Sequence, residues 1–255
     1  MTSTIIACIA FACVFGGASL GMFLRRALPE HHLSSDSKDV IKLGIGLVGT
    51  MSALVIGLLI SSAKSTFDTQ NSELTQSAAN VVVLDHLLAH YGPETRAARD
   101  LLRRVTTDWL DQLWPAAGSR PVALPATKGA QPPIEAIQEI IRGLAPQSDA
   151  QRQLQSQSLQ VTATLSQTRW LFLGQFGGRG IPMPFLVILI AWLVVIFISF
   201  GLFAPPNQTV IAVLLLCALS ASGAIFLILE MEHPFEGLMK VSDAPLRAAL
   251  AQLDQ

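Results

Sequence analysis

The sequence predicts an all-α integral membrane protein. We expect four transmembrane helices in two hairpins, with an extramembranous α-helical bundle inserted between the second and third helices. Charged residues make up only 14% of the 255 residues, against about 25% in ordinary soluble domains. Charges are missing entirely from four long windows. The polar stretch between the second and third windows repeats apolar residues every three or four positions, which is typical of helices.

The four uncharged windows are long enough to cross a bilayer as helices. They comprise residues 4–24, 43–63, 181–203 and 207–229. About 20 apolar residues span a hydrocarbon core of about 30 Å, and a helix satisfies all of its own backbone polar groups in lipid. The first window lacks the basic start of a signal peptide and is followed by Arg25 and Arg26. We therefore expect it to be retained as a membrane helix.

Two connections pair the windows into hairpins. Pro205 and Pro206 lie in the short gap between the last two windows, and proline there predicts a tight turn because it cannot continue a helix. A polar loop, residues 25–42, joins the first two windows. We divide the chain into membrane helices 1–63, a helical domain 64–180, membrane helices 181–229 and an amphipathic tail 230–255.

Basic residues near the membrane are balanced between the two sides, so they leave the orientation open. Dominance of the first helix favours a cytoplasmic position for Arg25 and Arg26, with the insert outside.

Helical periodicity recurs through the insert. The spacing of apolar residues predicts helices over 74–91, 98–113, 134–144 and 148–172, and a short tail helix over 246–253. Five prolines mark residues 115–133 as a loop.

A polar helix is expected to continue the second membrane window. Residues 61–80 are polar on nearly every side and contain no helix breaker, which predicts one helix over 41–91. A helix that is polar all round is unstable alone. It is either a solvated stalk or the lining of a water-filled vestibule.

Small residues are concentrated in the second window. Gly49, Ala53 and Gly57 recur every four residues, and glycine costs about 1 kcal/mol in a helix interior. Something is therefore expected to approach this helix closely, either a neighbouring helix of the same chain or another copy around a pore. The candidate pore or packing residues are Gly46, Gly49, Thr50, Ala53, Gly57, Ser61 and Ser62. Gly17 and Gly21 form a second surface for close helix contact.

Acidic residues near the ends of the apolar windows form two candidate sites. The loop residues Glu30, His31, His32 and Asp36 lack the spacing that places two metal ligands on one helix face, so we expect no metal. Glu230 ends an uncharged span, where a carboxylate is costly unless it is hydrated or paired. It is the candidate for an entrance or gating carboxylate, and a helix-end anchor is the alternative.

Other chemistries have little support. The net charge is −1, so nucleic-acid binding has no electrostatic footprint. All three cysteines lie in the apolar windows. No nucleophile–base pair or phosphate loop is present in a suitable context, so we expect no enzyme and no cofactor.

Two sequence blocks resemble a bacterial family of membrane proteins labelled bestrophin-like. The first runs from Leu28 through Asp36 and Gly44 to Asp68, and the second from Phe226 through Pro234 to Arg247. The resemblance implies a four-helix membrane protein and, one step further, an oligomeric anion channel.

We therefore expect a homo-oligomeric, channel-like protein of a bacterial inner membrane, with the second membrane helix nearest the axis. Its partners would be the lipid bilayer, further copies of itself and inorganic ions. The alternative is a non-conducting sensor or scaffold whose helical insert binds a partner.

Overall fold

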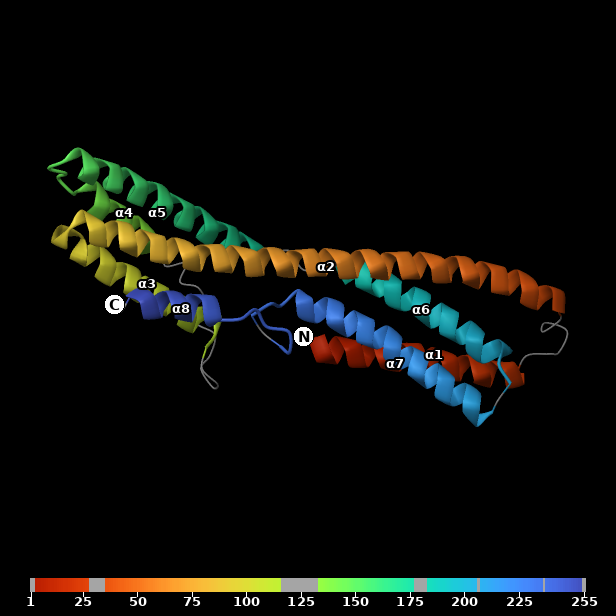
Figure 1. Cartoon of the computed structure of the whole chain (residues 1–255). Helices are drawn as coiled ribbons and strands as arrows, with labels where there is room; N and C mark the ends of the chain where they lie inside the picture. Colours follow the sequence, from red (N-terminus) through yellow and green to blue (C-terminus); the bar gives the residue numbers. More distant parts are fainter. Residues whose placement is uncertain are drawn as a thin grey trace. The chain divides into compact units, whose positions relative to one another are not determined.

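The computed structural model describes residues 3–27, 35–115, 133–176, 183–205, 207–235 and 237–253. Throughout these ranges the secondary structure is helical and contains no strand (Figure 1), which confirms the all-α prediction. The chain divides into two compact units. The first comprises Met1–Phe67 and Arg179–Met239, and the second Asp68–Gly178 and Lys240–Gln255. Each unit is described by itself.

The first unit contains α1 (Ser3–Ala27), the beginning of α2 (Ser35–Tyr91), α6 (Met183–Phe203) and α7 (Gln208–Met231). All four helices are long and apolar enough to cross a membrane. The four membrane helices expected from the sequence are therefore confirmed. Each begins and ends within a few residues of its uncharged window, except α2, which starts earlier and extends far beyond it.

Close packing of α1 against α6 organises the first unit. A Cβ at Gly21 would overlap the carbonyl oxygen of Ile198, and a Cβ at Gly201 would overlap that of Ala18. Neither position has room for a side chain, so the backbones approach as small residues allow in lipid. The helix contact expected at Gly17 and Gly21 is confirmed. Apolar residues of α1, α6 and α7 form the core, with one face of α2 packed against it.

The turn between α6 and α7 is tight, as the prolines predict. α6 ends at Phe203 and α7 begins at Gln208. The side chain of Asn207 accepts a 2.9 Å hydrogen bond from the backbone N–H of Val210, which satisfies one of the free donors at the start of α7.

The second unit contains the rest of α2, η2 (Pro93–Thr95), α3 (Arg96–Leu113), α4 (Pro133–Arg142), α5 (Asp149–Phe176) and α8 (Ala244–Leu253). Four helices share one core, whose centre is lined by Leu84 of α2, Leu102 of α3, Ile137 of α4 and Leu165 of α5. The helices predicted over 98–113, 134–144 and 148–172 correspond in approximate position to α3, α4 and α5. Most of the loop expected over 115–133 lies outside the described residues.

The tail helix α8 packs on α3 within the second unit. Trp114, which follows α3, donates a 3.1 Å hydrogen bond from Nε1 to the backbone carbonyl of Val241. This contact attaches the C-terminal segment to the helical bundle, which the sequence did not predict.

The long second helix is confirmed. The sequence predicts helix over 41–91, and α2 extends six residues further toward the N-terminus, to Ser35. It ends at Tyr91, and the next residue, Gly92, has a φ of 137°, a conformation that favours glycine.

Candidate functional site

The membrane part of α2 presents three different faces. The first face packs against the rest of the first unit, and its residues recur every three or four positions, which places them together on the helix. Ser52 and Ala63 are buried on this face. The other packed residues are Ile45, Val48, Val55, Ile56 and Leu59.

A second face carries small residues and contacts no other helix among the described residues. Its members recur in steps of three or four and are all exposed: Gly46, Thr50, Ala53, Gly57 and Ser61. We call this the small-residue stripe. A Cβ built at Gly46, Gly49 or Gly57 would meet no atom of another helix within 4 Å among the described residues. No described helix of the same chain fills the space beside these glycines. Gly49 lies at the edge of the packed face and is half-buried. Ser62 is exposed, on a side of the helix away from the stripe.

The third face consists of large apolar side chains. Leu43, Leu54 and Leu58 are 78%, 68% and 70% exposed, and Leu47 and Met51 lie on the same side. Branched and unbranched aliphatic side chains of this kind suit contact with lipid tails. On α2, the face suited to lipid contact and the small-residue stripe are therefore different faces of the same helix.

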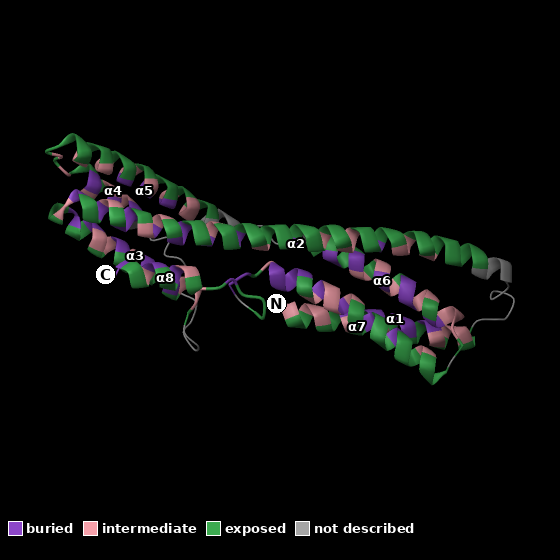
Figure 2. Ribbon diagram, viewed as in Figure 1, coloured by how far each residue is buried: buried purple, intermediate pink, exposed green. Residues whose placement is uncertain are grey.

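α2 is much less covered than its neighbours. Only 6% of its most apolar 18-residue window is buried, against 28% for α1, 33% for α6 and 28% for α7. Figure 2 shows this part of α2 almost entirely as exposed or intermediate surface. The least covered membrane helix is also the one richest in unpartnered glycine.

Two hydroxyl groups in the membrane part of α2 donate to backbone carbonyls of the same helix. Thr50 donates from Oγ1 to the carbonyl oxygen of Leu47 at 2.8 Å, and Ser52 donates to that of Val48 at the same distance. Such bonds let hydroxyls lie in an apolar environment without an exposed donor. The hydroxyl oxygen of Thr50 still has an acceptor lone pair directed away from the helix.

Glu230 lies at the end of α7 and is only 5% exposed. Its Oε2 accepts a 2.6 Å hydrogen bond from the backbone N–H of Leu238. Gly237 between them has a φ of 83°, and a Cβ there would overlap the Glu230 carboxylate. This geometry favours the helix-end anchor, one of the two roles that were open for Glu230 from the sequence. Its partner, the backbone N–H of Leu238, could not be predicted from residue spacing.

The interfacial loop candidates cannot be placed. Glu30, His31 and His32 lie outside the described residues, and Asp36 lies in the first turn of α2 with its side chain outside them. Among the side chains that are described, no group of three His, Cys, Asp or Glu residues could hold a metal ion.

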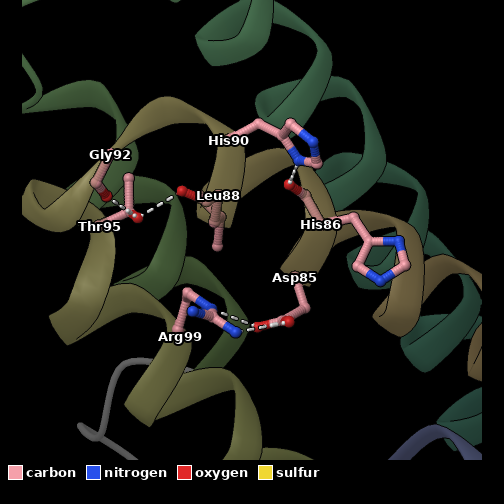
Figure 3. Close-up of polar contacts among 7 residues, drawn as sticks. All are labelled: Asp85, His86, Leu88, His90, Gly92, Thr95 and Arg99. Atoms are coloured by element: carbon pink, nitrogen blue, oxygen red, sulfur yellow. Dashed lines mark hydrogen bonds and ion pairs between the residues drawn. The ribbon is translucent and has the colours of Figure 1, made fainter. Parts of the chain in front are cut away.

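A polar corner fixes the hairpin between α2 and α3 in the second unit (Figure 3). Asp85 is buried, and its two carboxylate oxygens accept hydrogen bonds of 2.6 and 2.9 Å from Arg99. The bond to this carboxylate raises the pKa of Arg99 above its ordinary value. Thr95 donates to the carbonyl oxygens of Leu88 and Gly92 at 2.6 and 2.8 Å. The pairing of Asp85 with Arg99 could not be predicted from sequence periodicity, because periodicity identifies only the apolar face of a helix.

These observations define a multi-pass α-helical membrane protein with an uncovered glycine-rich helix. A family model described as the bestrophin-like domain matches residues 12–246. The chain belongs to the bestrophin-like family. No curated protein and no solved structure matches it.

Proposed function

We propose that the chain is the subunit of a homo-oligomeric ion channel in which α2 lies nearest the symmetry axis. The second unit would be the extramembranous part. The observation that carries the proposal is the small-residue stripe, which is exposed in the single chain although its glycines carry a propensity cost.

The contrast with α1 supports this assignment. Gly21 and Gly201 serve close packing inside the subunit, because each meets a backbone carbonyl of the other helix. The α2 glycines meet nothing comparable. In lipid there is no hydrophobic force between helices, so close approach through small residues is a main source of association. A second copy of α2 is the partner that the stripe suits at Ala53 and Gly57.

The polarity of the stripe supports a lining role. Thr50 and Ser61 bring hydroxyl groups to a surface otherwise made of glycine and alanine. Small side chains leave room for a pore around the symmetry axis. Hydroxyl oxygens coordinate an ion weakly, so that the ion can leave again. Membership of the bestrophin-like family favours a channel over an enzyme.

Ion flux from purified protein in liposomes tests the proposal. We expect flux from the wild-type protein and a large loss of flux in Thr50→Trp and Ala53→Trp. Leu54→Trp is the matched control, because Leu54 is exposed on the apolar face of the same helix turn. It should conduct as the wild type does.

Two outcomes would contradict the channel. Absence of flux from a correctly assembled wild-type protein would favour a scaffold whose helical insert binds a partner. Conductance that Thr50→Trp and Ala53→Trp leave unchanged would show that any ion path lies elsewhere.

A further inference from the structure

A pocket of about 470 Å³ opens between the beginning of α2 and the end of α6. Its volume is within the range of sites that bind small molecules. All of its described lining belongs to the first unit. The lining residues that matter here are Lys42, Gly46 and Gly49 of α2 and Phe200, Phe203 and Ala204 of α6.

The absence of side chains at two glycines creates part of this hollow. A Cβ at Gly46 or Gly49 would meet no atom of another helix within 4 Å among the described residues. Phe200 and Phe203 supply aromatic walls, so most of the interior is apolar. The pocket therefore suits a hydrocarbon chain better than a polar metabolite.

Positive charge lies at one end of the pocket. Lys42 is the charged residue among the described lining. Arg25, in the last turn of α1, donates a hydrogen bond to the carbonyl oxygen of Ala204, another lining residue. A guanidinium has five N–H donors, and Arg26 follows directly. Asp39 forms an exposed 3.4 Å ion pair with Lys42, so the described basic groups still outnumber the acidic one.

The location matches the membrane interface. Lys42 directly precedes the apolar window of α2, and Ala204 directly follows α6. The cationic end is therefore at the level of lipid headgroups, and the aromatic part extends into the hydrocarbon region. Basic pockets between membrane helices are typical sites for anionic headgroups.

We propose that this pocket binds an anionic phospholipid, with one acyl chain between α2 and α6 and the phosphate beside Lys42 and Arg25. A second copy of the chain fits the charge less well. The acidic side chains described in the first unit are Asp39, already paired with Lys42, the buried Glu230, and Glu232. Glu232 follows the far end of α7, about 36 Å along the helix from Gln208. A lipid phosphate complements the positive charge of Lys42 and Arg25.

Native mass spectrometry after exchange into nanodiscs tests the proposal. Nanodiscs of mixed phosphatidylglycerol and phosphatidylcholine provide both headgroups, and the lipid retained per subunit is counted together with the oligomeric state. We expect the wild type to retain phosphatidylglycerol, and Gly49→Phe to lose it because the phenyl ring fills the pocket. Gly44→Phe is the matched control, since Gly44 is exposed two residues before Gly46 and does not line the pocket.

A charge variant tests the headgroup. Lys42→Gln should reduce the preference for phosphatidylglycerol about fivefold, the effect of one basic residue near an anionic surface. Equal lipid retention in wild type, Gly49→Phe and Gly44→Phe would overturn the proposal. Dissociation of the oligomer in Gly49→Phe with unchanged lipid per subunit would also overturn it, because a second copy would then be the occupant.

Discussion

The backbone N–H of Leu238 donates a 2.6 Å hydrogen bond to Oε2 of Glu230, eight residues earlier in the chain. The bond folds the segment after α7 back onto the end of that helix. It gives a buried carboxylate at the end of a membrane helix a specific donor, where an unpaired charge would be costly.

Replacing Glu230 tests this anchor. Glu230→Ala leaves the Leu238 N–H without its acceptor, at a cost of about 1 to 3 kcal/mol. Glu230→Gln keeps a carbonyl oxygen and should lose less. Thermal unfolding in detergent measures both. A gating carboxylate would instead give variants with unchanged unfolding temperature and altered conductance.

Gly237→Ala should destabilise the same segment through its backbone. The φ of 83° is strained for any residue with a side chain, and the new Cβ would overlap the Glu230 carboxylate. A cost of at least about 1 kcal/mol is expected. The double variant with Glu230→Ala should cost less than the sum of the two, because the overlap is then removed. Additive losses would refute the coupling between these residues.

Two glycines with opposite surroundings give a matched pair of variants. Gly21→Ala should destabilise the first unit by about 1 to 3 kcal/mol, because its Cβ has no room beside Ile198. Gly44→Ala should be neutral or slightly stabilising, since alanine favours the helix and nothing lies nearby. The measurement is thermal unfolding in detergent. Equal effects of the two substitutions would contradict the close contact between α1 and α6.

The Asp85–Arg99 pair should stabilise the second unit. Arg99→Ala leaves a buried carboxylate without a partner. We expect a loss of about 2 to 3 kcal/mol, below the 3 to 5 typical of fully buried pairs, because 34% of the Arg99 side chain is exposed. Hydrogen exchange of the α2–α3 corner in the full chain measures the loss. Asp149, in an exposed pair with Arg152, supplies the control Asp149→Ala, with little effect.

The pH dependence of this pair follows from the raised pKa of Arg99. A group whose pKa is higher in the folded state than in the unfolded state stabilises the fold at pH values below its unfolded-state pKa. This stabilisation is lost as the pH rises through the folded-state pKa. For arginine this window is strongly alkaline. Protection of the corner by Arg99 should therefore be constant from neutral pH to about pH 10, and a loss of protection near neutral pH would contradict the assignment.

The sequence predicted the elements better than their partners. Hydropathy and periodicity are properties of single segments, so the four membrane helices and the helices around Leu84, Leu102 and Ile137 could be predicted. Gly17 with Gly21 and Gly49 with Gly57 show the same kind of small-residue pattern. Only the structure distinguishes them, because the first pair contacts α6 and a Cβ at either residue of the second pair would meet no described atom of another helix.

Contacts between segments far apart in the chain could not be predicted from the local sequence pattern. The bond from Trp114 to Val241 joins residues 127 positions apart, and a tryptophan at the end of a helix is compatible with many partners. The anchor of Glu230 likewise depends on a turn whose direction is set by Gly237. Neither could be predicted from composition or spacing.

Cysteine cross-linking along α2 in native membranes tests the central claim, that this helix meets its own copies at the small-residue stripe. The background needs Cys8, Cys13 and Cys217 replaced by serine, since all three are exposed. Single cysteines at Ala53 and Gly57 should give cross-linked subunits in high yield, and those at Leu54 and Leu58 should give little. Monomers at every stripe position, or equal yields on both faces, would contradict the account.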